Sequence, residues 1–447
     1  MNAISPQPSI RLIKNLRRHG YESYWAGGCV RDQLLRRRPS DFDIATSAKP
    51  DEVRKLFRKT VAIGKAFGVM LVIEKDVPVE VATFRGEGGY RDGRHPSKIF
   101  YATAERDAQR RDFTVNGLFF DPVEKKLIDY VGGRKDLSRK VIRAIGEPEE
   151  RFREDHLRLL RAVRVATALH FKIEPRTWKA VQKLAPLIKK ISAERIREEL
   201  TKLLCSGRAE RGLRLLYESG MLKVLLPEIQ AMRGVKHSRD YHPEGDVWVH
   251  TLRVMSKLPA DRLTPTLAWA TLLHDVGKPK TAEKKRVKGR WRWRFPGHAE
   301  TGDRISRKIL GRLKWPRAET DQICEMVRNH MTFKDVRAMR LSTLKRLLAR
   351  PLFPEELELH RADCLGSHRM LKNYQFLKRK QKEMTREIIR PKPLVTGHDL
   401  LAMGWEEGPE IGCLLRMVEE KQLEGDLKNR EQALAWIRVE CKKTFAK

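Results

Sequence analysis

Residues 27–43, GGCVRDQLLRRRPSDFD, constrain the fold and chemistry of this chain more than any other segment. They contain two adjacent glycines and end in the acidic pair Asp41 and Asp43. Because side chains alternate along an extended segment, both carboxylates are predicted to lie on one face. Mg²⁺ takes oxygen ligands and usually arrives with substrate phosphates. The backbone N–H groups of Gly27 and Gly28 give a triphosphate close approach. Together these features predict a metal-dependent nucleotidyl-transfer site.

An Asp-x-Asp pair alone also occurs in solvated loops. With the two glycines and with Arg31-Asp32 just before it, the string GGxVRD…DFD resembles the signature of the polymerase-β-like superfamily. Within that superfamily it is similar to class II tRNA nucleotidyltransferases and bacterial poly(A) polymerases. The resemblance implies that Asp41 and Asp43 are catalytic and hold Mg²⁺. It also implies nucleotide contacts from Gly27, Gly28 and Arg31.

Length and charge agree with a nucleic-acid enzyme. The 447 residues are enough for two to four domains. An excess of 93 basic over 58 acidic residues gives a net charge of +35, which favours nucleic acid over a membrane surface as partner. The sequence contains no apolar run of about 18 residues, so no membrane-spanning helix is predicted. Six scattered cysteines without a CxxC pair favour the reducing cytoplasm. The sequence indicates no obligatory protein partner.

The predicted fold class is α+β. Residues 21–28, 69–76 and 79–85 are predicted strands, and 51–59 is a predicted helix. From about residue 147 onward the pattern is helical, and 154–171 is predicted as one helix. The resemblance divides the chain into a polymerase-β-like nucleotidyltransferase head with a small mixed sheet (1–146), an all-α neck that binds the nucleotide base and RNA (147–230), an HD body (231–366) and a helical, tRNA-binding tail (367–447).

Two further segments complete the predicted head site. Glu80 lies between apolar strand neighbours, where a buried carboxylate needs a metal or a base; an ion pair with Arg85 is the alternative. The resemblance implies that Glu80 is the third catalytic carboxylate. The Gly-rich stretch 84–96 is predicted to be a mobile loop, with a surface hairpin as the alternative. It resembles the flexible loop of CCA-adding enzymes, including a D-x-R-x-P element at 92–96, which members that add only two C residues tend to lack.

Residues 110–122, RRDFTVNGLFFDP, match the family's second motif, with Gly117 where Ala is usual. In the family this motif recognises the ribose, and its polar side chains also suit a triphosphate. The nucleotide-binding residues that the resemblance implies here are Arg110, Arg111, Asp112 and Asn116.

Glu154, Arg158 and Arg161 share one face of the predicted helix 154–171. From the residues alone, an ion-pair face is the simpler interpretation. The string also resembles the EDxxR motif of class II enzymes, whose Asp and Arg side chains pair with the edge of CTP or ATP. Asp155 and Arg158 would then read the base, with Arg161 beside them. This chemistry is reasonable because an Asp accepts from the exocyclic amine that both C and A carry.

A second constellation of histidines and aspartates lies on helical sequence. Neutral imidazoles and carboxylates suit a divalent transition metal. The order H…HD…H…H…D resembles the HD phosphohydrolase superfamily over roughly residues 240–365. This resemblance implies a divalent metal (Mn, Ni, Co, Fe or Mg) and phosphatase or cyclic phosphodiesterase activity on 2′,3′ ends. The predicted ligands are His250, His274, Asp275, His298, His330 and Asp363. Lys278 is a candidate phosphate contact, and His237, His242 and His360 are predicted not to be ligands.

The segment 393–438 looks like the C-terminal part of bacterial CCA- or A-adding enzymes, which implies recognition of the tRNA elbow. The sequence therefore predicts a nucleotidyltransferase that adds or repairs the 3′-CCA end of tRNA from CTP and ATP, with an attached HD domain. An A-adding enzyme remains an alternative because CCA- and A-adding enzymes share the EDxxR motif. A poly(A) polymerase is another alternative, against which the tail favours tRNA. An HD phosphohydrolase with a head that only binds RNA is a further alternative, which the three head carboxylates disfavour.

Overall fold

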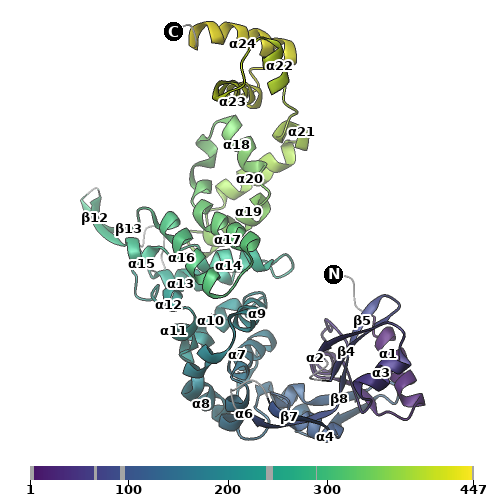
Figure 1. Ribbon diagram of the computed structural model, residues 1–447. Coiled ribbons are helices and arrows are strands. Elements are labelled where there is room, and N and C mark those ends of the chain that lie inside the picture. The colour runs from purple at the N-terminus through teal and green to yellow at the C-terminus, as the bar shows by residue number, and fades with distance from the viewer. Residues whose placement is uncertain (1–4, 65–67, 91–95, 238–244, 288, 445–447) are drawn as a thin grey trace. The chain divides into compact units, whose positions relative to one another are not determined.

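The computed structural model describes residues 5–64, 68–90, 96–237, 245–287 and 289–444. Two compact units make up the chain, and they are coloured by residue number in Figure 1. The first comprises residues 1–230 and 311–315, and the second comprises 231–310 and 316–447. The finer division into four domains stays a prediction. Among the described residues, no helix is long and apolar enough to cross a membrane.

The first unit begins with a seven-stranded mixed sheet. Strands β2 and β5 run parallel, and the other neighbouring pairs are antiparallel. In pairing order the strands are β3 (Thr60–Gly64), β4 (Val69–Glu74), β5 (Val77–Thr83), β2 (Ile44–Thr46), β1 (Ser23–Ala26), β8 (Leu118–Asp121) and β9 (Lys126–Asp129). The three predicted strands correspond to β1, β4 and β5, so the predicted mixed sheet of the head is confirmed.

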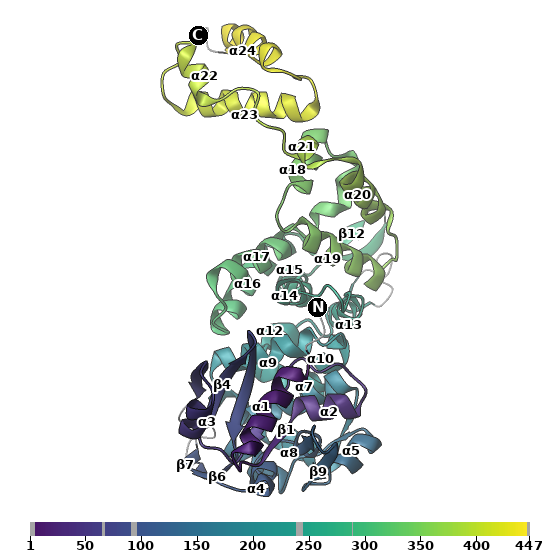
Figure 2. The ribbon, with the colours of Figure 1, turned by 90° about the vertical axis from the view of Figure 1, so that its right-hand side faces the viewer.

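Short helices surround this sheet. Helix α1 (Gln7–Arg18) lies against β1, β2, β4 and β5 (Figure 2) and buries Leu12, Ile13 and Leu16 there. These residues recur at helical spacing, which makes one face of α1 apolar. The other head helices are α2 (Gly28–Leu34), α3 (Pro50–Leu56), α4 (Ala104–Gln109) and α5 (Gly133–Arg139). Helix α3 confirms the prediction at 51–59, whereas α2 was not predicted.

The described residues of the Gly-rich stretch 84–96 include strand structure. Its first part forms β6 (Arg85–Tyr90), which pairs antiparallel with β7 (Pro96–Tyr101). The alternative interpretation, a hairpin, therefore fits the described residues. Four residues of the D-x-R-x-P element, 92–95, lie outside the part of the chain that the structure describes.

The rest of the first unit is helical, but the predicted helix 154–171 is interrupted. Helix α6 ends at Glu154 and α7 begins at Leu157, because Asp155 adopts an extended backbone with φ −136° and ψ 104°. A short parallel pair, β10 (Val141–Ile142) and β11 (Lys172–Ile173), flanks this region. The helices are α6 (Pro148–Glu154), α7 (Leu157–Leu169), α8 (Pro175–Leu184), α9 (Ala193–Leu204), α10 (Ala209–Glu218), α11 (Met221–Leu225) and α12 (Pro227–Gln230).

The second unit contains a helical body and one two-stranded ribbon. The body helices are α13 (Val247–Met255), α14 (Pro265–Leu273), α15 (Lys278–Thr281), α16 (His298–Arg312), α17 (Arg317–Asn329), α18 (Leu341–Leu348) and α19 (Phe353–Gly366). The ribbon is formed by β12 (Glu283–Val287) and β13 (Arg290–Arg294), which pair antiparallel. The prediction that everything after residue 147 is helical is therefore wrong at β11 and at this ribbon.

The C-terminal part of the second unit has its own small core. Its helices are α20 (Lys372–Glu383), α21 (Arg386–Ile389), α22 (Gly397–Ala402), α23 (Pro409–Glu424) and α24 (Arg430–Thr444). Leu400, Leu414, Val418 and Ile437 bring α22, α23 and α24 together in one apolar cluster, as Figure 2 shows for the three helices. The Lys345 ammonium of α18 donates to the Leu423 carbonyl at 2.7 Å and ties α23 to the body.

Candidate functional sites

The turn between β1 and α2 places the two glycines at the centre of the head. Gly27 has φ 74°, a left-handed conformation that glycine adopts without strain. A Cβ at this position would stand 3.1 Å from an Arg111 guanidinium nitrogen, so glycine lets that side chain approach. The Gly27 N–H donates to the Leu118 carbonyl at 3.3 Å. That N–H is therefore already paired, contrary to the expectation that it is offered to a triphosphate.

The three predicted head carboxylates lie near one another at the neighbouring strands β2 and β5. Asp41 and Asp43 lie just before β2, outside the strand itself. Glu80 lies on β5, and the parallel register pairs the next residue of each strand, Ile44 with Val81. Burial, followed by the charges of Asp41 and Glu80, raises the pKa of Asp43 to about 7. Three carboxylates that repel each other in this way are suited to a hard cation.

Glu80 differs in one respect from the expectation. Its side chain is exposed, whereas a buried Glu was predicted from its apolar neighbours. The alternation along β5 explains the difference, because Val79 and Val81 are buried on the opposite face. An exposed carboxylate beside Asp43 is accessible to a metal that arrives with a nucleotide.

The predicted ribose and triphosphate residues form one hydrogen-bonded network. Arg31 donates to Asp32 through two bonds of 2.9 Å and to the Asn116 amide oxygen at 2.7 Å. The Asn116 amide nitrogen donates in turn to Asp112 at 3.0 Å, and an Arg161 nitrogen lies 2.7 Å from the second Asp112 oxygen. Burial alone would raise the pKa of Asp112. The Arg161 charge and these hydrogen bonds nevertheless hold the pKa of Asp112 below its ordinary value. The network therefore keeps a buried carboxylate ionised.

Asp107, which sequence reasoning missed, orients the two arginines of the second motif. It is buried at 1% exposure and accepts from Arg110 at 2.6 Å and from Arg111 at 2.9 Å. These partners stand three and four residues further along the chain, a spacing at which helical side chains meet. That spacing could have revealed Asp107. The Arg111 guanidinium also lies 5.0 Å from the centroid of the Phe119 ring, which further fixes its direction.

Asp155 lies in the short non-helical segment between α6 and α7. Its Oδ1 accepts the Leu157 N–H at 3.0 Å, and its Oδ2 lies 3.2 Å from an Arg195 nitrogen. Arg195 comes from α9, so the sequence offered no sign of this contact.

Arg158 is buried and also has several partners. It donates to Glu154 at 2.7 Å, which is the ion pair that the simpler interpretation predicted. It also donates to the carbonyls of Arg151 and Arg110 at 3.0 Å each. Asp155 and Arg158 are therefore held in fixed positions by neighbouring groups.

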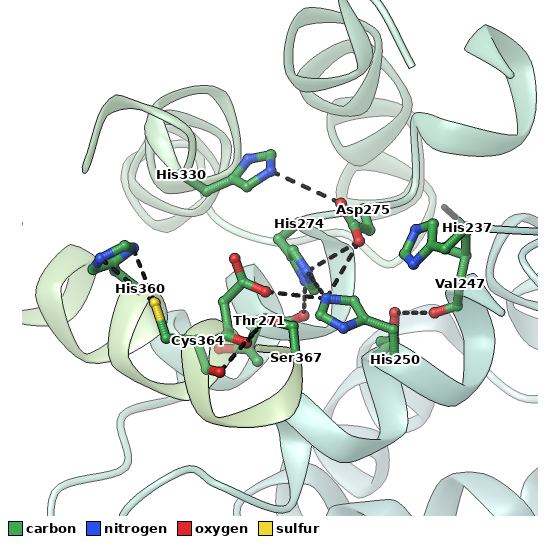
Figure 3. Close-up of polar contacts among 12 residues, drawn as sticks. His237, Val247, His250, Thr271, His274, Asp275, His330, His360, Cys364 and Ser367 are labelled. Atoms are coloured by element: carbon green, nitrogen blue, oxygen red, sulfur yellow. Dashed lines mark hydrogen bonds and ion pairs between the residues drawn. The ribbon is translucent and has the colours of Figure 1, made fainter. Parts of the chain in front are cut away.

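The six predicted HD ligands come from five elements of the second unit. Figure 3 shows four of them, His250, His274, Asp275 and His330, close together. His250 lies on α13, and His274 and Asp275 directly follow α14. His298 begins α16, and His330 directly follows α17. Asp363 lies on α19, with an oxygen 3.1 Å from His250 Nε2. Sequence order alone could not show that these segments meet.

Asp275 belongs to two groups of potential ligands at once. One group contains His250, His274 and Asp275, and the other contains Asp275, His298 and His330. Asp275 Oδ2 lies 3.3 Å from His274 Nε2 and 3.6 Å from His250 Nε2. Asp275 Oδ1 lies 3.7 Å from His298 Nε2 and 3.8 Å from His330 Nε2. A carboxylate in this position has one oxygen for each of two cations.

Backbone carbonyls set the direction of three of these imidazoles. The Nδ1 atoms of His274, His298 and His330 lie 2.8, 2.8 and 2.6 Å from the carbonyls of Thr271, Phe295 and Val327. A carbonyl only accepts, so each Nδ1 carries the hydrogen and each Nε2 presents its lone pair to the centre. Burial, with His274 and His298 nearby, lowers the pKa of His330 to about 3, which keeps it neutral. These are the properties of metal-ligating imidazoles.

The remaining residues of this region have other positions. The Lys278 ammonium lies 2.7 Å from Asp275 Oδ2 and 3.1 Å from His237 Nε2. His360 stacks on Phe333 and lies 3.6 Å from the Cys364 sulfur. Among the described residues, neither His237 nor His360 belongs to the two ligand groups. His242 lies outside the described residues.

Comparison with known proteins agrees with both sites. Residues 23–143 match the family described as poly A polymerase head domain, and 170–232 match the probable RNA and SrmB-binding site of polymerase A. Residues 247–366 match the HD domain and include the five residues of the two ligand groups and also Asp363. A CCA-adding enzyme of Enterococcus faecalis is 31% identical over 434 residues, which cover 95% of this chain and 93% of the relative. The chain belongs to the family of CCA-adding enzymes.

Other CCA-adding enzymes extend this comparison. That of Geobacillus stearothermophilus is 44% identical over 216 residues, which cover 48% of this chain and 53% of the relative. The crystal structure of Bacillus stearothermophilus CCA-adding enzyme in complex with CTP shares 28% identity at a TM-score of 0.75, over 98% of both chains. The Thermotoga maritima CCA-adding enzyme complexed with tRNA shares the fold, at 20% identity and a TM-score of 0.58 over 98% of this chain and 97% of that one. The predicted family and nucleotidyltransferase class are confirmed.

Proposed function

We propose that this chain completes or repairs the 3′-terminal CCA of tRNA from CTP and ATP. The convergence of Asp41 and Glu80 on Asp43 carries this proposal; burial and then the charges of these two carboxylates raise the pKa of Asp43 to about 7. Such a site is poised for a cation and is adjacent to a network of arginines. The relationship to CCA-adding enzymes over nearly the whole chain supports the same reaction. The net charge of +35 suits an RNA substrate.

In the proposed reaction the oxygen of the terminal ribose 3′-OH attacks the α-phosphorus of the nucleotide. The new P–O bond forms as the bond to pyrophosphate breaks. Asp41, Asp43 and Glu80 would hold Mg²⁺, which when bound lowers the pKa of the attacking hydroxyl and stabilises the leaving charge. Arg111, fixed by Asp107, provides positive charge near Asp43 for the triphosphate.

Asp155 and Arg158, at the interruption between helices α6 and α7, would contact the nucleotide base. Asp155 Oδ2, oriented by Arg195, is suited to accept from the exocyclic amine of C or A. Arg158 is suited to donate to ring acceptors of the same base. The fixed positions of both side chains support selection without a template strand.

Addition to tRNA transcripts that end at the discriminator base, at C and at CC tests this proposal, with CTP and ATP supplied singly and together. Growth from the discriminator base to a full CCA is the expected result. A single A added only to the CC-ended transcript would indicate an A-adding enzyme. Long A tails on any RNA would indicate a poly(A) polymerase.

A second proposed activity is metal-dependent phosphoester hydrolysis at the HD site. The observation that favours it is Asp275, shared by two groups of potential ligands in which His274, His298 and His330 present their lone pairs to the centre. The residues fit two divalent cations, and an activated water would attack the phosphorus while a ribose oxygen leaves and takes a proton. The proposed substrates are phosphate esters at the 2′ and 3′ positions of RNA ends, with Lys278 near the phosphate.

Hydrolysis of an RNA that ends in a 2′,3′-cyclic phosphate tests the HD activity, with Mn²⁺, Ni²⁺, Co²⁺, Fe²⁺ and Mg²⁺ added one at a time. We expect activity that a chelator removes and that Asp275→Asn abolishes. No turnover with any of the five ions would contradict the proposal. We also propose that the enzyme acts in the cytoplasm, which agrees with five free cysteines among those whose side chains the structure describes.

A further inference from the structure

The ribbon β12–β13 has a composition unlike the helices around it. Six of its ten strand residues are Lys or Arg and one is acidic, and β13 reads Arg-Trp-Arg-Trp-Arg. Figure 1 shows the ribbon projecting from the body beside α15 and α16. Five residues per strand give it a length of about 17 Å. No role in nucleotide addition or in metal binding accounts for this ribbon.

The register of the two strands sorts these side chains into two faces. Lys284 stands opposite Trp293, and Arg286 stands opposite Trp291. Residues directly opposite each other project on the same side of a sheet. One face therefore carries two indoles and two cations, which we call the aromatic face: Lys284, Arg286, Trp291 and Trp293. The Lys284 ammonium, 5.7 Å from the centroid of the Trp291 ring, agrees with this arrangement.

Trp291 is 64% exposed, so most of its indole lies in water. The opposite face carries the pairs Lys285–Arg292, Glu283–Arg294 and Val287–Arg290 and is mainly basic. Alternating aromatic and basic side chains are what single-stranded nucleic acid requires, because bases stack on aromatic rings while cations meet the phosphates. An acidic polypeptide would pair with the cations but would not need the flat faces of two indoles.

Both ends of the ribbon are fixed at the HD site. Strand β12 follows α15, whose first residue, Lys278, contacts Asp275. Phe295 directly follows β13, and its ring centroid lies 5.4 Å from the Lys278 ammonium. The carbonyl of Phe295 lies 2.8 Å from His298 Nδ1. A strand of RNA that lies along the ribbon is thereby led to the ligand groups at its base.

We propose that the β12–β13 ribbon is an arm that binds single-stranded RNA and presents its end to the HD site. Bases stack on the aromatic face at Trp291, and the cations of both strands meet the phosphates. In known single-strand binders, loss of one stacking ring weakens binding roughly 10-fold or more. The proposal rests on the proposed HD activity for the identity of the site that receives the RNA, but binding by the arm is measurable separately.

The test uses the full chain with Arg286→Gln combined with Trp291→Ala. The control is the single variant Arg317→Gln, which removes one cation and leaves Trp291 in place. Arg317 is a nearly fully exposed cation of the same unit. Hydrolysis is measured on an RNA oligonucleotide with a 2′,3′-cyclic phosphate and on bis(4-nitrophenyl) phosphate. We expect the arm variant to raise KM for the RNA about 10-fold or more and to leave turnover of the small ester unchanged. The variant Trp291→Phe retains an aromatic ring on which a base can stack, so it should keep most of the wild-type affinity for RNA.

An unchanged KM for RNA in the arm variant, or an equal rise in the control, would overturn the proposal. If the wild-type chain hydrolyses neither substrate, the proposed HD activity fails, and ultraviolet crosslinking of a single-stranded RNA then decides on the arm. Crosslinks at Trp291 would support it, and crosslinks confined to residues outside 283–294 would overturn it. Binding of anionic phospholipid vesicles that depends on Trp291, with RNA binding unaffected, would also overturn it.

Discussion

The Nε2 atoms of His298 and His330 lie 3.2 Å apart, and neither can donate a hydrogen to the other. Each ring directs its Nδ1 to a backbone carbonyl, at Phe295 and at Val327, so each neutral ring has its hydrogen there. Two lone pairs at this distance repel each other. Protonation does not relieve the contact, because burial and neighbouring histidines lower the pKa of His330 to about 3. A cation bound by both rings would relieve the repulsion, which agrees with the proposed metal site.

The first prediction concerns metal content. The wild-type chain, purified with Mn²⁺ and dialysed, should retain two ions at the HD site because Asp275 offers one oxygen to each ligand group. His330→Ala should retain about one, and Asp275→Asn should lose both. Mass spectrometry of the metal content checks this. His360→Asn is the matched control, since His360 lies in the same unit outside both groups. Two ions retained by Asp275→Asn would contradict the shared site.

The second prediction separates the two activities. Asp41→Ala combined with Asp43→Ala should abolish nucleotide addition to tRNA, because the cation site of the head loses two of its three carboxylates. The same variant should hydrolyse a 2′,3′-cyclic phosphate at the wild-type rate, since the HD ligands are untouched. Both reactions are followed on labelled RNA by gel electrophoresis. Nucleotide addition that persists in the double variant would show that the head site has been assigned to the wrong residues.

The third prediction concerns stability and pH in the absence of metal. The pKa of Asp43 rises from about 3.8 to about 7 on folding, so the folded state binds the proton more tightly. The resulting stability is fully present below about pH 4 and is lost as the pH rises to about 7. Asp43→Asn, which carries no charge, should therefore gain in relative stability over this window. At pH 8 with EDTA we expect its melting midpoint to exceed that of the wild type by a few degrees, since 1 kcal/mol shifts a unit of this size by about 2–4 °C.

A matched measurement at pH 5 keeps this prediction testable. There the two proteins should melt much closer together, because most Asp43 side chains are protonated in the folded wild type. An equal difference at pH 5 and pH 8 would mean that the substitution acts through packing and not through the charge. Scanning calorimetry of the first unit's transition in the full chain provides both values.

Local patterns allowed much of this fold and of both sites to be predicted. Asp41 and Asp43 lie within one short segment, so their proximity follows from backbone geometry alone. The alternating and helical patterns located strands such as β5 and helices such as α7. The six HD residues could be proposed from their types and order, and the structure brings them together; their role as ligands stays a prediction.

Contacts between distant segments could not be predicted in this way. Nothing in the sequence relates Arg195 to Asp155, which lie 40 residues apart. The break at Asp155 was also missed, because the residues on both sides keep the apolar spacing of a continuous helix. The ribbon β12–β13 was also missed. Strand β12, Glu-Lys-Lys-Arg-Val, has no apolar alternation, whereas β13, Arg-Trp-Arg-Trp-Arg, alternates and could have been predicted as a strand. Each strand of the ribbon pairs with the other along its whole length.

The last prediction tests how the base is selected. Asp155→Ala should reduce the preference for CTP and ATP over UTP and GTP by about 10- to 100-fold, since one well-placed base contact is worth about 1–3 kcal/mol of discrimination. Arg195→Ala leaves the carboxylate in place but removes its partner at 3.2 Å, so it should reduce the preference by a smaller factor. Lys202→Ala, which removes an exposed cation from the same helix, is the control and should leave selectivity unchanged. Competition between pairs of nucleotides on a CC-ended tRNA provides the ratio directly. If Asp155→Ala keeps the wild-type preference, the base is read elsewhere, and the contact between Asp155 and Arg195 serves only to join α9 to the break before α7.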